Sequence, residues 1–277
     1  MRKAFVVGHP IAHSRSPLIH GQWLRDLGIA GSYERIDVPP EDFAAFVRGL
    51  AQAGFAGGNV TIPHKEAAFQ LADSLTARAK KIGAVNTLVV REDGILGDNT
   101  DAPGFIAHLD QSLGPDWLPR SGGTAVVLGA GGAARAVVTG LAEHGINRIL
   151  VANRSPERAR ALTAIEPERI EPIDWSALPK ELARAGLLVN TTSLGMTGHP
   201  PLDLDLDALP ATAAVADIVY APLETPLLSA ARARGLLVVD GLGMLLHQAV
   251  PGFEAWFGVR PQVTSQLRDL IVADLTR

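Results

Sequence analysis

Short apolar runs alternate with longer stretches of helical periodicity along almost the whole of this 277-residue chain. Runs of four to eight apolar or β-branched residues favour strands, whereas apolar positions repeated every three or four residues favour helices. In the first hundred residues the short runs predict extended segments at 4–7, 33–38, 58–62, 85–91 and 95–97. The periodic stretches predict helices at 17–27, at 41–53 and from residue 63 onward, with Ser16 capping the first of them.

A second block with the same alternation follows a stretch rich in proline and glycine at 114–123. Its apolar runs predict strands at 124–128, 148–152, 187–190, 214–219 and 236–239. Helices are predicted after the glycine cluster at 129–132, after Ser155 and Pro156, and at 242–257 and 264–275. Pro251 and Gly252 are expected to break or kink the helix at 242–257. Alternating strands and helices imply a mostly parallel sheet covered on both faces.

Length and composition narrow the classes of protein to consider. A chain of 277 residues favours two domains, although a single large α/β barrel is also possible. With 47% hydrophobic residues and a net charge of −4, the chain can bury a core and is poorly suited to binding nucleic acid or an anionic membrane. Without cysteine it has no disulfides and no thiolate metal site. No apolar run approaches the length of a membrane span, so we expect a cytoplasmic protein.

The glycine cluster is the first candidate site. Gly129, Ala130, Gly131, Gly132, Ala133 and Ala134 form a G-x-G-x-x-A pattern between a predicted strand and a predicted helix. Such a turn lets a dinucleotide pyrophosphate approach the backbone and the helix N-terminus. The alternative is an ordinary tight connection between a strand and a helix. The order of strand, turn, helix and next strand favours the dinucleotide site.

The end of the next strand indicates which dinucleotide would bind. NAD sites usually carry Asp or Glu at this point, where it holds the ribose 2′-hydroxyl. This chain has Asn153, Arg154 and Ser155 instead, with Arg158 one turn later. Arginine can pair with a 2′-phosphate, so the sequence favours NADP. The alternative is a solvated arginine beside a helix-capping serine.

Five polar segments in the first hundred residues suggest a second site. Each lies at a predicted strand end or helix start; they are 14–16, 59–61, 63–65, 86–87 and 98–101. Their hydroxyls, amides, lysine and aspartate suit a small polyhydroxylated ligand. Any one segment is equally well explained as a cap or a turn, but five together favour a binding site.

Taken together these motifs resemble the shikimate dehydrogenase family. The matching segments, in order along almost the whole chain, are Gly8–Pro17, Asn59–Glu66, Gly83–Thr87, Gly97–Asp101, Asn190–Met196 and Asp240–Leu245. The resemblance implies an α/β protein of two domains. A substrate domain with a mixed sheet would comprise 1–103 and 242–277. A Rossmann-type NADP domain with a doubly wound parallel sheet would be inserted at 104–241.

The resemblance also implies the role of each site residue in reversible reduction of 3-dehydroshikimate to shikimate. Ser14 and Ser16 would hold the substrate carboxylate. The residues implied for the ring hydroxyls and their surroundings are Thr61, Lys65, Asn86, Asp101, Gln248 and Tyr220. NADP would contact the glycine turn (Gly129 to Ala133), Asn153, Arg154, Ser155 and Arg158, and also Ile218 and Gly241. The expected partner is a small-molecule substrate, and the protein would be a monomer or a homodimer.

Lys65 and Asp101 are the implied catalytic pair. Reduction of a ketone builds negative charge on oxygen, which an ammonium group can stabilise while donating a proton. A nearby carboxylate would keep the lysine charged, whereas burial would favour the neutral amine, and the sequence leaves open which effect is larger. The alternative is a solvated lysine at a helix start.

Besides the interruption at Pro251 and Gly252, the sequence departs from the family pattern at two positions, and three other functions are possible. Gly21 stands where the family often has asparagine, and Ala77 stands where an acidic residue often approaches the cofactor. A quinate dehydrogenase, perhaps using NAD, is the nearest rival, but Ser16 and Arg154 favour shikimate and NADP. A catalytically silent sensor predicts a damaged Lys65 and Asp101 pair. A nucleic-acid-binding protein would need a basic stripe or motif, which this sequence lacks.

Overall fold

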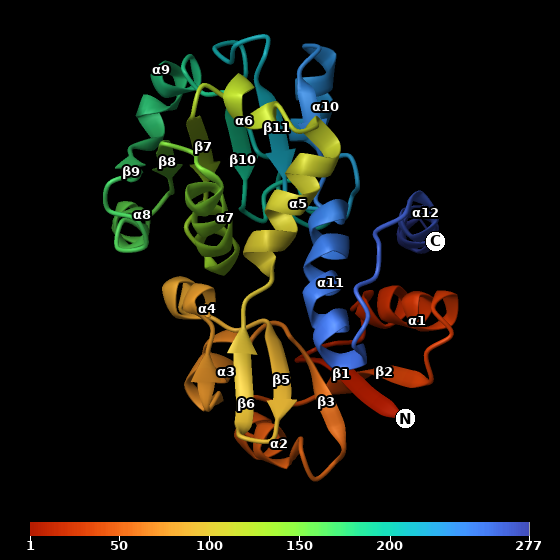
Figure 1. The fold of residues 1–277 in the computed structure, drawn as a ribbon. Coiled ribbons are helices and arrows are strands. Elements are labelled where there is room, and N and C mark those ends of the chain that lie inside the picture. Colours follow the sequence, from red (N-terminus) through yellow and green to blue (C-terminus); the bar gives the residue numbers. More distant parts are fainter. Residues whose placement is uncertain (277) are drawn as a thin grey trace. The chain divides into compact units, whose positions relative to one another are not determined.

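The computed structural model describes residues 1–276, which divide into two compact units. The first unit combines residues 1–100 with the residues from 248 onward, and the second comprises 101–247 (Figure 1). One α/β unit is thus inserted in the sequence of another, as the predicted fold class requires. The predicted boundaries after 103 and 241, and the assignment of substrate and cofactor to the two parts, stay predictions.

The first unit contains a six-stranded mixed sheet with the order β2-β1-β3-β5-β6-β4. Its strands are β1 (Arg2–Gly8), β2 (Gly31–Asp37), β3 (Phe55–Val60), β4 (Ser74–Leu75), β5 (Thr87–Arg91) and β6 (Gly94–Asp98). β1 pairs in parallel with β2 and β3, whereas β5 is antiparallel to β3 and β6. This confirms the predicted mixed sheet. The sequence did not predict β4, which is only two residues long.

Helices of the first unit are α1 (Ser16–Asp26), α2 (Phe43–Gly49), α3 (Lys65–Leu71), α4 (Ala77–Ile82) and α12 (Ser265–Leu275). The expectation that Ser16 caps α1 is wrong, because Arg15 takes the cap position and Ser16 is the first helical residue. α4 was not predicted. Its start is fixed by the Thr76 side chain, which accepts from the backbone N–H of Ala79 at 3.2 Å.

α11 (Leu242–Phe257) begins in the second unit and ends in the first. The predicted break at Pro251 does not occur, since the helix continues through that residue. A proline inside a helix costs about 3 kcal/mol, chiefly through one lost hydrogen bond. Phe253 and Trp256, which follow Pro251 in the same helix, are fully buried. Burial of one large apolar side chain is worth about 1.5–3 kcal/mol, so packing offsets the cost of the proline.

Two apolar layers cover the faces of the first sheet. One contains Phe5, whose ring meets the edges of Phe46 and Phe55 at centroid distances of 5.1 Å. The other contains Trp256, whose indole N–H donates to the carbonyl of Leu88 at 2.9 Å. Gly57 permits that contact, because a Cβ there would lie 2.5 Å from the indole nitrogen.

The second unit contains a six-stranded sheet with the order β12-β11-β10-β7-β8-β9, in which every pair is parallel. Its strands are β7 (Thr124–Leu128), β8 (Arg148–Ala152), β9 (Ile170–Ile173), β10 (Leu187–Asn190), β11 (Ala214–Asp217) and β12 (Leu237–Val239). Numbered within the unit, the order is 3-2-1-4-5-6, which is the doubly wound order of dinucleotide-binding domains. The predicted Rossmann-type sheet is therefore confirmed, although β9 was not predicted.

The helices of this unit are α5 (Asp101–Leu113) and α6 (Trp117–Arg120), which precede β7, and α7 (Gly132–His144), α8 (Pro156–Leu162), α9 (Leu178–Leu182) and α10 (Pro226–Ala233), which follow it, with a 3-10 turn at Trp175–Ala177. Successive residues of β7 belong to different apolar layers. Val127 packs in the layer that contains Val137 of α7, and Val126 packs in the layer that contains Leu228 of α10. Burial on both faces explains why these strands read as continuous apolar runs.

Candidate active site

One edge of the first sheet collects most of the predicted substrate residues. The carboxyl ends of the parallel strands β1 and β3 lie side by side, because Val7 pairs with Val60. The antiparallel strand β5 begins at the same edge, where Thr87 lies between Asn59 and Asp98. The segments that follow β1, β3 and β6, and the one that precedes β5, therefore meet there.

Ser14 and Ser16 occupy the connection from β1 to α1. The backbone N–H of Ser16 donates to the Ser14 hydroxyl at 3.3 Å, so the two predicted carboxylate ligands lie next to each other. Ser14 is half-buried and Ser16 is buried. The carbonyl of Ser14 also accepts from the guanidinium of Arg35 at 2.8 Å, which fixes this connection to β2.

Thr61 and Lys65 follow β3. The backbone N–H of Thr61 donates to the carbonyl of Val7 at 2.9 Å, which continues the pairing with β1. A Cβ on Gly8 would lie 2.6 Å from the Thr61 methyl group, so glycine allows this close approach. Lys65 begins α3 and is half-buried, and its carbonyl accepts from the N–H of Val85 at 3.0 Å. The ammonium group is thus attached to a helix fixed at the same sheet edge.

Asn86 and Gln248 complete the predicted set in this unit. Both are buried, and the Asn86 amide donates to the Gln248 side-chain oxygen at 3.5 Å. Gln248 comes from α11, far from Asn86 in the sequence. Four further buried polar residues form hydrogen bonds with Asn86 or with one of its partners and were not among the predicted site residues: Tyr33, Asn59, Thr87 and Thr100. The polar segments at 59–61 and 86–87 gave a partial signal, but Tyr33 gave none.

Asp98 fixes the turn that precedes Asp101. Its carboxylate accepts from the hydroxyl of Thr76 at 2.6 Å and from the guanidinium of Arg78 at 2.8 Å. Burial alone would raise the pKa of Asp98, but the hydrogen bonds from Arg78 and Thr76 hold it below its usual value. Asp98 is therefore ionised at neutral pH. The neighbouring Asn99 is held by its amide, which donates to the carbonyl of Ala84 at 3.1 Å.

Asp101 and Tyr220, the other predicted substrate residues, belong to the second unit. Asp101 is the first residue of α5, and Tyr220 follows β11; both are half-buried. Lys65 and Asp101 are thus placed in different units, and their roles are taken up below as proposals.

The predicted cofactor turn lies between β7 and α7. Gly129 has a φ of +105°, which side-chain-bearing residues rarely adopt, and a Cβ there would lie 2.7 Å from the hydroxyl oxygen of Thr191. Around Gly131 and Gly132, in contrast, a Cβ would meet no atom within 4 Å. Ala133 follows in the first turn of α7. The arrangement leaves room for a pyrophosphate over backbone N–H groups at a helix N-terminus.

The segment after β8 carries two cationic side chains. Arg154 and Arg158 are exposed, and within residues 1–276 neither side chain has a hydrogen-bond or ion-pair partner. The Asn153 amide donates to the carbonyl of Ser155 at 2.9 Å and so shapes the turn. Ser155 takes the cap position of α8 as predicted, but its side chain makes no capping hydrogen bond. Two guanidinium groups here suit a phosphate.

Ile218 and Gly241, also predicted to contact the cofactor, touch each other. A Cβ on Gly241 would lie 2.2 Å from the carbonyl oxygen of Ile218, so only glycine fits. The segment after β11 is held by Asp217, whose carboxylate accepts from the amide of Asn190 at 3.0 Å and the hydroxyl of Thr225 at 2.8 Å. Burial raises the pKa of Asp217, and these hydrogen bonds oppose the shift.

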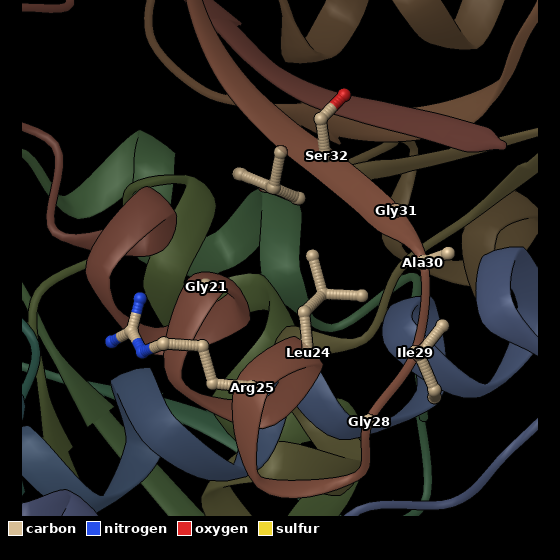
Figure 2. Close-up of a pocket in the computed structure, with 9 residues that line it drawn as sticks. Gly21, Leu24, Arg25, Gly28, Ile29, Ala30, Gly31 and Ser32 are labelled. Carbon is tan, nitrogen blue, oxygen red and sulfur yellow. The ribbon is translucent and has the colours of Figure 1, made fainter.

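A cavity of about 500 Å³ lies apart from these residues, between the end of α1 and the start of β2. Figure 2 shows its lining, which includes Gly21, Leu24, Arg25 and the segment 28–33. Gly21 is one of the departures from the family pattern, and a Cβ at this position would meet only the Arg25 guanidinium, at 3.6 Å. None of the predicted site residues lines this cavity.

Residues 1–276 contain no group of three His, Asp or Glu side chains placed to hold a metal ion. In the same range, no helix has the length and apolar character needed to span a bilayer.

Family models match three parts of the chain. The shikimate dehydrogenase substrate binding domain matches residues 6–88. The shikimate / quinate 5-dehydrogenase model matches residues 118–196, and the shikimate 5′-dehydrogenase C-terminal domain matches residues 241–265. The three models together cover both units.

Individual proteins are similar over almost their entire length. A protein of Methylobacterium radiotolerans named shikimate dehydrogenase (NADP(+)) is 72% identical, with 99% of this chain and 97% of the relative aligned. The crystal structure of the Thermus thermophilus shikimate 5-dehydrogenase with NADP(H) and shikimate is 38% identical, covers 99% and 100% of the two chains, and has a TM-score of 0.85. The quinate dehydrogenase of Corynebacterium glutamicum with NAD is 33% identical, covers 98% and 99%, and has a TM-score of 0.89.

Proposed function

This chain belongs to the shikimate dehydrogenase family, and we infer that it catalyses the NADP-dependent, reversible reduction of 3-dehydroshikimate to shikimate. The structural observation that carries this function is the edge of the first sheet, where hydroxyl, amide and ammonium side chains gather on four neighbouring segments. That mixture suits a small acid bearing several hydroxyls. The reaction places the protein in aromatic amino-acid biosynthesis.

NADP is the cofactor that best fits the second unit. The open space around Gly131 and Gly132 admits a pyrophosphate, and Arg154 and Arg158 offer unpaired charge for a 2′-phosphate. When bound, NADP(H) supplies the hydride acceptor or donor. Ala130 and Ala133 would border the pyrophosphate. Asn153 and Ser155 would border the adenosine ribose. Ile218 and Gly241 would border the opposite end of the dinucleotide.

We assign the substrate carboxylate to Ser14 and Ser16, because their hydroxyls lie together on a short connection and can donate to two carboxylate oxygens. Thr61, Asn86 and Gln248 would bind the ring hydroxyls, with Tyr220 nearby. These neutral groups can donate hydrogen bonds to hydroxyls and accept hydrogen bonds from them.

Lys65 is the proposed proton donor. As hydride reaches the carbonyl carbon of 3-dehydroshikimate, the C=O π electrons move to oxygen, and the Lys65 ammonium donates the proton that completes the hydroxyl. In the oxidation of shikimate the neutral amine accepts that proton. Asp101 would assist by accepting a hydrogen bond from the reacting hydroxyl.

Quinate is the competing substrate, because one family model and one similar structure are named for it. Quinate carries an extra hydroxyl on the carbon that bears the carboxylate. The buried Ser16 beside Ser14 favours shikimate in our interpretation, and the arginine pair favours NADP over NAD. We further propose a cytoplasmic monomer or homodimer, and light scattering after size exclusion would distinguish the two assemblies.

Replacement of Lys65 tests the mechanism. General acid–base catalysis typically contributes about 10²- to 10⁴-fold, so Lys65→Ala should lower kcat for shikimate oxidation by about that factor and change KM much less. Lys80→Ala, which removes an exposed lysine of the neighbouring helix α4, is the matched control and should retain full activity. A Lys65→Ala enzyme with an unchanged kcat and a raised KM would show that Lys65 only binds substrate.

A further inference from the structure

A buried chain of hydrogen bonds passes behind the proposed substrate edge. The Tyr33 hydroxyl donates to the Asn59 side-chain oxygen at 2.6 Å, and the Asn59 amide donates to the Thr87 hydroxyl at 3.3 Å. The Thr87 hydroxyl donates to the Asn86 side-chain oxygen at 2.9 Å. Tyr33, Asn59, Asn86 and Thr87 are all at most 9% exposed. Thr87 therefore connects the interior of the sheet to a predicted substrate ligand.

Two backbone groups fix the direction of every bond in this chain. At one end, the Asn59 amide also faces the carbonyl oxygen of Asn86 at 3.3 Å, and a carbonyl can only accept. The Asn59 nitrogen must therefore point toward Asn86 and Thr87, and its oxygen toward Tyr33. The Thr87 oxygen accepts from Asn59, and its hydroxyl donates to the Asn86 side-chain oxygen, which can only accept.

At the other end, the backbone N–H of Thr100 points at the Asn86 side-chain oxygen at 2.8 Å. A backbone N–H can only donate, so the atom that it meets must be the oxygen and not the nitrogen of the amide. The Thr100 hydroxyl lies 3.2 Å from the same oxygen and 3.2 Å from the Thr87 hydroxyl. The acceptor side of Asn86 is thus fully engaged inside the protein.

We propose that Thr87 is a positioning residue for substrate recognition: its buried hydroxyl holds the Asn86 amide so that Asn86 offers N–H donors, and not its oxygen, to a substrate hydroxyl. This rests on the proposed function, in which Asn86 binds a ring hydroxyl. Asn86 then recognises an oxygen that accepts a hydrogen bond. A ligand with an ammonium group in that place has no lone pair to accept one and would be disfavoured.

The proposal differs from a purely structural role for Thr87. A valine in its place has almost the same shape and leaves no buried polar atom alone, because the Asn59 amide keeps the Asn86 carbonyl as acceptor. Fold stability should therefore change little. Valine removes one hydrogen bond that restrains the Asn86 side chain. Loss of that restraint should weaken substrate binding.

The experiment compares wild-type enzyme with Thr87→Val, Thr87→Ala and Thr87→Ser in shikimate oxidation with NADP⁺. One neutral hydrogen bond corresponds to roughly a threefold to tenfold change, so KM for shikimate should rise by about that factor in the valine and alanine variants. The serine variant keeps a hydroxyl and should stay within about twofold of wild type. In all variants, kcat and KM for NADP⁺ should change less than about twofold. Thr139→Val, which removes another buried threonine hydroxyl in α7, is the matched control and should leave KM for shikimate unchanged.

Each outcome decides the matter. An unchanged KM for shikimate in active Thr87→Val and Thr87→Ala enzymes would overturn the positioning role. An equal rise in KM for shikimate and KM for NADP⁺ would also overturn it, because it indicates general structural damage. The same holds if less protein folds but the folded enzyme has wild-type kinetics. If neither variant lacking the hydroxyl folds while Thr87→Ser does, the role is structural and the proposal fails. A wild-type enzyme that does not oxidise shikimate would instead reject the proposed function, and this inference with it.

Discussion

His20 makes the stability of the first unit depend on pH. Its ring is completely buried on α1 and stacks on Tyr33 at a centroid distance of 4.0 Å, with Trp23, Phe253 and Trp256 around it. Within the described residues neither ring nitrogen has a hydrogen-bond partner. Burial lowers the pKa of His20 to about 3. The nearby Asn59 side chain opposes that shift, although it forms no hydrogen bond with either ring nitrogen.

The sign and size of the effect follow from linkage. Between pH 6.5 and pH 3 the unfolded chain carries a proton on His20 that the folded protein does not, so the free energy of unfolding falls as pH decreases. With these two pKa values, lowering the pH from 8 to 5 should cost about 2 kcal/mol from this residue alone. The contribution is fully present above the unfolded-state pKa and is lost progressively below it.

The test compares urea unfolding of wild-type protein and His20→Phe between pH 5 and pH 8. Phenylalanine cannot titrate, so its curve should lack the loss of about 2 kcal/mol at pH 5, whatever constant cost its larger ring adds at every pH. Fluorescence in a Trp117→Phe, Trp175→Phe background leaves Trp23 and Trp256 of the first unit as reporters. His13→Gln, at an exposed histidine, is the control. Parallel curves for wild type and His20→Phe, within about 0.5 kcal/mol, would refute the reasoning.

Two further substitutions test the second unit. Arg154→Ala should raise KM for NADP⁺ at least roughly tenfold, because a charge-assisted pair with the 2′-phosphate is lost, and should leave KM for NAD⁺ within about twofold. An unchanged ratio of the two KM values would contradict the assignment of Arg154 to the 2′-phosphate. Gly129→Ala places a Cβ 2.7 Å from the Thr191 oxygen at a φ of +105°. The substitution should therefore destabilise the protein by about 1–3 kcal/mol and weaken NADP⁺ binding. If the thermal unfolding midpoint and the KM for NADP⁺ both equal those of wild type, the turn tolerates a side chain.

The elements best predicted from sequence are those whose signal is local. β7, β8 and β10 were predicted to the residue, because strands buried on both faces must be apolar throughout. β4 was missed because two residues carry no pattern. β9 was missed because Glu171 and Pro172 interrupt its apolar run. Of the break or kink expected at Pro251, the break does not occur, because tertiary packing of α11 outweighs the local cost of the proline.

The site was predictable in the same uneven way. The glycine turn is a contiguous motif, and its strand and helix could be recognised on either side of it. The hydrogen bonds from Tyr33 to Asn59, and from Asn59 to Thr87, join residues that are 26 and 28 positions apart in the sequence. They exist only because β3 pairs with β5 and because β2 lies in the same sheet. No periodicity in one segment encodes such a contact, which is why the positioning role of Thr87 emerged only from the structure.

The most direct test of the whole account is a matrix of initial rates, with shikimate or quinate as substrate and NADP⁺ or NAD⁺ as cofactor, followed by the absorbance of the reduced nicotinamide. The account predicts the highest kcat/KM for shikimate with NADP⁺ and clearly lower values in the other three combinations. A higher kcat/KM for quinate, or for NAD⁺ with either substrate, would contradict it.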